Sequence, residues 1–292
     1  MELLEKFKTK IATGINIWTE QHYKANEPII YVYCERSAYK IFYTKYIEDH
    51  LDTSPNLDWK GQIVVNCELT PSKLRAVYHY NTKNNGTAYK QFYFLDSSEQ
   101  LFTKMPTFTR TNIHYTTPYS VFNHFLNQPV IQWVCQQILK EHFDCNEQEE
   151  AEYFGQFWNA YQTFQKDIAL PLMRTIIQKY KEEQYYNMSA IQLGAFIQWD
   201  DNLTLWYAPN VLKKQLLYTL SDLPPISKEK LQNHLSRQLI VGFFELYFKA
   251  LAKKSKTALR KPIEDLLCEF IHPTHYFPPS LRLFLNTNFQ AS

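Results

Sequence analysis

Glycine is scarce in this chain, with six residues among 292. Average usage would supply roughly three times as many. Phosphate-binding loops need clustered glycines, because backbone N–H groups must approach the anion without a Cβ in the way. The glycines here stand apart, at Gly14, Gly61, Gly86, Gly155, Gly194 and Gly242. This spacing excludes the glycine-built nucleotide loops and the nucleophile elbow, and we expect no cofactor.

Closely spaced cysteines are missing as well. The chain holds five cysteines and no C-x-x-C motif, and they lie at Cys34, Cys67, Cys135, Cys145 and Cys268. Secreted disulfide frameworks and structural zinc sites are built from cysteines in pairs or short clusters. We therefore expect buried free thiols in a reducing, cytoplasmic compartment, and no metal.

Long apolar runs and a strong charge of either sign are missing as well. The richest apolar stretch, 239–251, is interrupted by Glu245 and Lys249, and a membrane-spanning helix needs roughly 18 such residues. The chain starts with Glu2 and Glu5 and without an apolar signal sequence. The formal net charge is +2, from 31 basic and 29 acidic residues. Such a balance gives no overall field for nucleic acid or an anionic membrane, so we expect a cytoplasmic protein without a membrane span.

Aromatic residues are abundant instead, with 20 Phe, 21 Tyr and 6 Trp. In residues 1–108 they accompany an amphipathic stripe at 3–22, which predicts a helix. Alternation and β-branched content predict four strands after it. These strands are expected at 29–35, 62–69, 74–82 and 89–95. Asn84-Asn85-Gly86 favours a hairpin turn, so the sequence predicts an antiparallel β-meander.

Residues 37–50 fit two structures. Tyr39, Ile41 and Tyr43 alternate as they would in a strand, whereas Ala38, Ile41 and Phe42 also suit a helix that begins at Ser37. The β-branched and aromatic content favours the strand, which is the prediction made here.

Residues 109–292 are predicted to be mostly helical. Helices are expected at 118–127, 129–142, 147–184, 188–198, 213–221, 227–253, 257–271 and 279–285, with an extended piece at 203–207. Phe157 and Tyr161 should face inward, and Pro171 should kink or divide its helix because proline lacks an N–H donor. The predicted fold class is α+β, with the helical region, 109–292, packed tightly on the region 1–108.

Two surfaces favour a protein partner. Tyrosine offers large contact area and a polar hydroxyl, and it is enriched at interfaces. The tyrosines considered for binding are Tyr31, Tyr33, Tyr43, Tyr78, Tyr80 and Tyr93. A run of acids without Lys or Arg can attract a basic partner, although acids also suit a helix N-terminus. This run comprises Glu147, Glu149, Glu150 and Glu152.

A basic run provides an alternative site. No acid occurs from Leu246 to Ile263, and such a run can grip phosphates or simply complement the end of a helix. The cations are Lys249, Lys253, Lys254, Lys256, Arg260 and Lys261. They would serve binding of nucleic acid or another anion.

An enzyme is the third possibility, with a site at the seam of the two regions. General acid–base work needs His and Asp or Glu brought together in space. The candidate residues are His114, His124, His142, Asp200, Asp201, His272 and His275. The leading hypothesis remains a non-enzymatic protein-binding protein, such as an inhibitor, an immunity-type neutraliser or an adaptor, with a rigid aromatic-rich surface.

Overall fold

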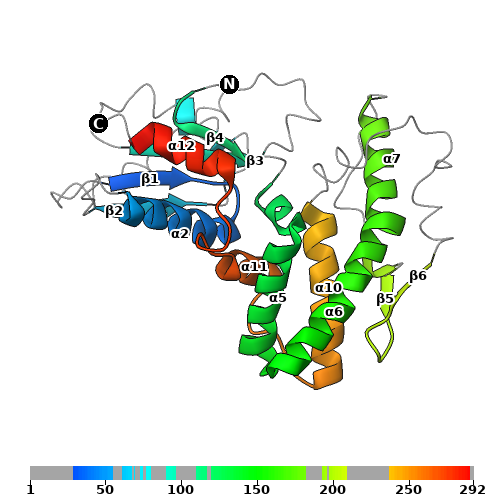
Figure 1. Cartoon of the computed structure of the whole chain (residues 1–292). Coiled ribbons are helices and arrows are strands. Elements are labelled where there is room, and N and C mark those ends of the chain that lie inside the picture. Colours follow the sequence, from blue (N-terminus) through cyan, green and yellow to red (C-terminus); the bar gives the residue numbers. More distant parts are fainter. Residues whose placement is uncertain are drawn as a thin grey trace, which may run out of the picture. The chain divides into compact units, whose positions relative to one another are not determined.

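The chain forms two compact units in a computed structural model, drawn in Figure 1. The first unit comprises Met1–Leu95, Thr107–Thr116 and Phe277–Ser292, and the second comprises Asp96–Pro106 and Thr117–Tyr276. The residues that the structure describes are 29–54, 61–67, 69, 73–74, 77–79, 90–96, 110–116, 120–181, 193–195, 197–208 and 237–289.

The main sheet of the first unit is parallel where its pairing is defined. Its strands, in the order β2-β1-β3-β4, are β2 (Gln62–Asn66), β1 (Ile29–Tyr33), β3 (Lys90–Asp96) and β4 (Ile113–Thr116). β1 runs parallel to both β2 and β3, so the predicted antiparallel meander is wrong for these strands. All five residues of β1 are buried. An unbroken apolar run of this kind is typical of a parallel strand that is covered on both faces.

Residues 37–50 form a helix, α2 (Ser37–Thr53), and not the predicted strand. Parallel neighbours cannot be joined by a tight turn, so β1 and β2 need a crossover connection, which α2 supplies. The buried residues of α2 recur at helical spacing and include Tyr39, Phe42, Tyr43 and Tyr46. The aromatic content of 37–50 favours a strand locally. Burial of the aromatic residues of α2 against the sheet stabilises the helix instead.

The segment 74–82, predicted as a strand, is helical wherever it is described, at Leu74 and 77–79. Leu74, Val77 and Tyr78 are buried together, and their spacing of three and four residues places them on one helical face. The predicted helix at 3–22 and the turn at 84–86 lie outside the described residues.

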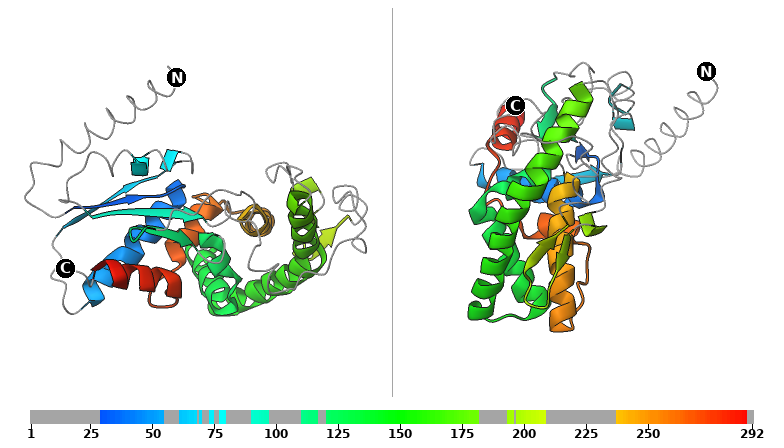
Figure 2. Two further views of the ribbon diagram at one scale, coloured as in Figure 1. Left: turned by 90° about the horizontal axis from the view of Figure 1, so that it is seen from above. Right: turned by 90° about the vertical axis from the view of Figure 1, so that its right-hand side faces the viewer.

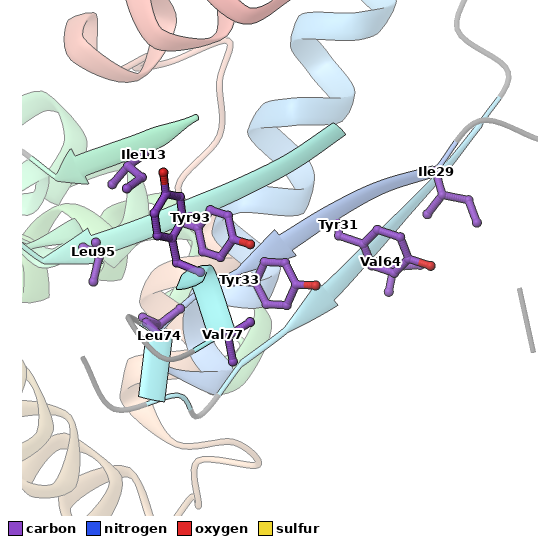
Figure 3. Close-up of a cluster of buried hydrophobic side chains, with 10 residues drawn as sticks. Ile29, Tyr31, Tyr33, Val64, Leu74, Val77, Tyr93, Leu95 and Ile113 are labelled. Atoms are coloured by element: carbon purple, nitrogen blue, oxygen red, sulfur yellow. The ribbon is translucent and has the colours of Figure 1, made fainter. Parts of the chain in front are cut away.

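Helices α2 and α12 (Pro279–Phe289) lie on the same side of this sheet, as Figure 2 shows. The ring of Tyr43 in α2 stacks on the ring of Phe94 in β3, with centroids 3.9 Å apart. The ring of Phe284 in α12 also contacts Phe94, with centroids 5.6 Å apart. The other face of the sheet carries a second buried cluster, which includes Tyr31 and Tyr93 (Figure 3). Aromatic side chains therefore fill the core on both sides.

The second unit contains most of the predicted helices. Its elements are η1 (Val121–Leu126), α5 (Gln128–Phe143), α6 (Glu147–Phe164), η2 (Gln165–Ala169), α7 (Leu170–Lys181), η4 (Leu193–Ala195), β5 (Ile197–Trp199), β6 (Leu205–Tyr207), α10 (Arg237–Ser255) and α11 (Ile263–Phe270). β5 and β6 form an antiparallel hairpin, so the helix predicted through residue 198 is wrong at its end. The segment 257–262, also predicted as helix, is a loop.

Pro171 divides the long predicted helix, as expected. α6 and α7 are separated by the π-helical turn η2, in which the N–H of Leu170 donates to the carbonyl of Gln165. Pro171 has no N–H, and its ring would meet the carbonyl of Asp167 in a regular α-helix. The wider π turn relieves that conflict immediately before the proline.

Helix α10 ends at a residue with left-handed backbone geometry, which yields a stability prediction. Lys256 has φ 54°, and the N–H of Thr257 donates to the carbonyl of Ala252 at 2.9 Å. Glycine adopts this conformation without the steric cost of a Cβ. Lys256→Gly should therefore raise the free energy of unfolding by about 0.5–1 kcal/mol relative to Lys256→Ala, measured by denaturant titration. Both variants remove the same charge, and equal stabilities would contradict the prediction.

Candidate functional site

Most of the tyrosines predicted for binding are core residues of the first unit. Five of the six are buried, namely Tyr31, Tyr33, Tyr43, Tyr78 and Tyr93, and Tyr80 lies outside the described residues. Tyr33 stacks on Tyr93 with ring centroids 4.9 Å apart (Figure 3), and the hydroxyls of Tyr43 and Thr116 lie 2.9 Å apart in a hydrogen bond. These five rings are packed inside the protein, so they offer no surface to a partner.

The predicted acids lie at the start of α6 and are largely exposed. The carboxylate of Glu149 accepts the backbone N–H of Asn146 at 3.0 Å, and the Asn146 side chain accepts the N–H of Glu149 at 3.1 Å. This capping box and the helix dipole give the acids a structural role. We call the four of them the acidic patch: Glu147, Glu149, Glu150 and Glu152.

Three of the predicted lysines lie at the end of α10 beside this acidic patch. Lys253, Lys254 and Lys256 are exposed and form what we call the lysine patch. The ammonium of Lys254 lies 5.7 Å from the ring centroid of Tyr153 in α6, and the hydroxyl of Tyr247 in α10 donates to the carbonyl of Tyr153 at 2.7 Å. The start of α6 and the end of α10 are thus neighbours, as both Figure 1 and Figure 2 show.

The other three predicted cations, Lys249, Arg260 and Lys261, line an open pocket of about 440 Å³. Its remaining lining residues are Glu245, Ala252, Leu259, Pro262 and Ile263. The structure thus divides the basic run of the sequence into two sites, a pocket and an exposed patch.

His142, at the end of α5, lies near the cations of this pocket. Burial lowers its pKa most, and the positive charges of Arg260 and Lys261 lower it further, whereas Glu141 and Glu269 raise it. The positive charges of Arg260 and Lys261 therefore reach the imidazole of His142 and disfavour its protonation. The imidazole favours its neutral form.

Two of the candidate enzyme residues, His272 and His275, lie close together in the second unit, with ring centroids 6.5 Å apart. His114 is buried in the first unit against Phe284, with ring centroids 5.1 Å apart. In the second unit, the carboxylate of Asp200 accepts the N–H groups of Asn202 and Thr204 in a turn. No group of three or more His, Cys, Asp or Glu suited to a metal ion occurs in the described part of the chain. The seam hypothesis stays a prediction.

The paired histidines after α11 have structural contacts. His275 packs on Trp133 with ring centroids 3.7 Å apart. His272 shares a hydrogen bond with the hydroxyl of Thr274 at 2.8 Å, and His124 lies 3.4 Å from the hydroxyl of Tyr276 through its Nδ1. These contacts hold the segment that follows α11. None of the five cysteines forms a disulfide, and Cys34, Cys135 and Cys268 are buried as expected, whereas Cys67 and Cys145 are half-buried.

A location that the sequence reasoning missed is the carboxyl end of β1. Cys34, Glu35 and Arg36 connect this strand to α2. β1 has β2 on one side and β3 on the other, and open parallel sheets place ligands at the carboxyl ends of such strands. The unbroken apolar run Ile29–Tyr33, followed by a helical pattern, was the signal in the sequence.

No protein-family model matches the chain, and no curated protein matches it either. Among the described residues, no helix is long and apolar enough to cross a membrane. Function must therefore be argued from the residues of this chain.

Proposed function

We propose that this chain is a non-enzymatic binding protein that docks on a protein partner through one end of its second unit. The observation that carries the proposal is the juxtaposition of the acidic patch and the lysine patch. The hydroxyl of Tyr247 in α10 donates a hydrogen bond of 2.7 Å to the carbonyl of Tyr153 in α6. This bond joins the two helices whose ends carry the patches. Their charges are exposed on neighbouring helix ends and so are available to a partner.

A surface of this kind suits a partner that itself presents both signs of charge. Complementary charges raise the association rate and reject wrong partners, because a misplaced partner brings like charges together. A nucleic acid presents one sign only, and its phosphates would meet the carboxylates of Glu147 and Glu152 beside the lysines. We therefore favour a protein over the nucleic-acid alternative.

The aromatic packing beneath the surface supports the same role. Phe157 of α6 lies 4.8 Å from Phe244 and 5.0 Å from Tyr247 of α10, measured between ring centroids. A close-packed interior holds the two helix ends at a fixed spacing. A rigid surface loses little entropy on binding, which favours affinity.

The test uses charge-neutral variants of each patch. The variants are Glu147→Gln with Glu152→Gln, and Lys253→Gln with Lys254→Gln. Partners are captured from cells that express the chain, and association rates are then measured with the purified partner at low and moderate salt. Each double variant should lower the low-salt rate by about tenfold, because exposed interface charges act mainly on association. Lys166→Gln and Asp201→Asn, which remove exposed charges outside both patches, should leave the rate unchanged.

Two results would overturn the proposal. One is a partner whose association is equally fast with the wild-type chain and with both double variants. The other is tight binding of a single-stranded oligonucleotide whose affinity falls steeply with salt and depends on the lysine patch. That second result would establish the nucleic-acid alternative instead.

A further inference from the structure

The pocket next to the lysine patch has two distinct walls. One wall is a face of α10 that presents Glu245, Lys249 and Ala252 at spacings of four and three residues. The other is formed by Leu259–Ile263, the segment that leads into α11. Its volume of about 440 Å³ lies within the range of small-molecule sites.

The charged groups of this pocket are mostly positive. Lys249 pairs with Glu245 at 2.6 Å, and Lys261 pairs with Glu269 at 2.7 Å outside the pocket lining. Both pairs are solvent-exposed, and such pairs contribute little to stability, so an incoming anion can compete for either lysine. The lining therefore holds three cations, Lys249, Arg260 and Lys261, and one carboxylate, that of Glu245, so its net charge is positive.

Arg260 is the cation best placed to bind a ligand. Its side chain is exposed, and no ion pair joins it to an acid in the part of the chain that the structure describes. A guanidinium can donate two parallel hydrogen bonds to a carboxylate or phosphate. The pKa of His142, which Arg260 helps to lower, shows that its charge acts toward the neighbouring end of α5.

The rest of the lining is apolar. Ala252, Leu259, Pro262 and Ile263 contribute hydrocarbon surface between the charged groups. An inorganic ion would leave this surface in water, whereas a ligand with a short apolar body would cover it. The pocket therefore combines an anion-binding group with an apolar wall.

We propose that this pocket binds a small organic anion, with its phosphate or carboxylate head at Arg260 and its apolar body against Ala252, Leu259 and Ile263. This site is separate from the docking surface, and its test needs no protein partner. Either of the two proposals can fail alone.

The experiment measures binding of four probes to the full chain by titration calorimetry. Hexyl phosphate and hexanoate carry both features, inorganic phosphate carries the charge alone, and hexanol carries the apolar body alone. At least one of the two amphiphilic anions should bind about tenfold more tightly than either partial probe, because head and body contribute together. The tighter of the two identifies the head group that the pocket prefers.

Three variants distinguish this pocket from general surface binding. Arg260→Ala should weaken the preferred amphiphile by about tenfold. Ala252→Phe, which fills the pocket without changing a charge, should weaken it by a similar factor. Lys140→Ala removes an exposed cation that lies outside the lining and should change affinity less than about twofold.

Circular dichroism and thermal unfolding confirm that each variant is folded before binding is compared. The proposal is overturned if inorganic phosphate binds as tightly as both amphiphiles, or if Ala252→Phe binds like the wild-type chain while folded. It is equally overturned if none of the four probes binds at millimolar concentration.

Discussion

Replacing Phe157 with alanine should lower the free energy of unfolding of the second unit by about 4 kcal/mol. Phe157 is 1% exposed and lies at the centre of the contact between α6 and α10. Its ring centroid lies 5.6 Å from Phe243, 4.8 Å from Phe244 and 5.0 Å from Tyr247. Removal of the ring leaves a cavity lined by other rigid rings, which cannot collapse to fill it.

The measurement is chemical denaturation, monitored by circular dichroism and tryptophan fluorescence. Phe157→Leu keeps most of the buried volume and should cost about 1 kcal/mol. Gln162→Ala changes an exposed position in the same helix and should alter stability by less than about 0.5 kcal/mol. A loss below about 1.5 kcal/mol for Phe157→Ala would mean that α6 and α10 do not share this core.

This core could be predicted from the sequence because its pattern is local. Phe157, Tyr161 and Phe164 recur at spacings of four and three, and the structure buries all three. The effect of Pro171 was equally local, since a missing N–H interrupts a helix in any context. Amphipathic spacing and proline therefore allowed the helix α6 and its interruption before α7 to be predicted from the sequence.

The first unit was harder because strand direction depends on the connection between strands. β1 and β2 fall within the predicted segments, and β3 extends one residue beyond its segment, to Asp96. Whether β1 and β2 are parallel neighbours depends on 37–50, because a helix crosses over the sheet and lets them pair side by side, whereas a strand would lie between them. Local propensity favoured the strand, whereas tertiary burial of Tyr43 and Tyr46 favoured the helix. Two segments wrongly predicted as strands, 37–50 and 74–82, thus produced the wrong sheet.

The candidate site shows the same division between local and tertiary information. The basic run 249–261 was visible in the sequence, but its division into a pocket and an exposed patch requires the chain to turn after α10. That turn uses the left-handed backbone of Lys256, at a residue type that does not signal it. The prediction of an exposed tyrosine surface was wrong for the tyrosines on strands because alternation does not show whether one face or both faces of the sheet are covered.

Acid should destabilise the first unit through the buried imidazole of His114. His114 of β4 is 7% exposed and packs against Phe94 and Phe284, with ring centroids 5.7 Å and 5.1 Å away. Burial in these surroundings lowers its pKa from 6.5 to about 4. Between these two values the unfolded chain binds a proton at His114 and the folded chain does not. Protons therefore favour unfolding, and stability falls as the pH drops below about 6.5.

The expected loss follows from the size of this shift. Each pKa unit corresponds to about 1.4 kcal/mol, so His114 should remove about 3 kcal/mol from the free energy of unfolding of the first unit between pH 7 and pH 4. His50 also has a pKa lowered by burial, and it destabilises the fold in an overlapping range. A variant must therefore separate the two contributions.

His114→Phe places a ring that does not titrate among aromatic neighbours, while His50 is left in place. The free energy of unfolding is measured at pH 7, 6, 5 and 4 for both chains. The wild-type curve should fall more steeply than that of the variant, and the gap should grow by about 3 kcal/mol over this range. His114→Gln, which keeps polarity without charge, should also show the shallower curve and so exclude an effect of apolar packing. Parallel curves for all three chains would show that His114 titrates alike in the folded and unfolded states.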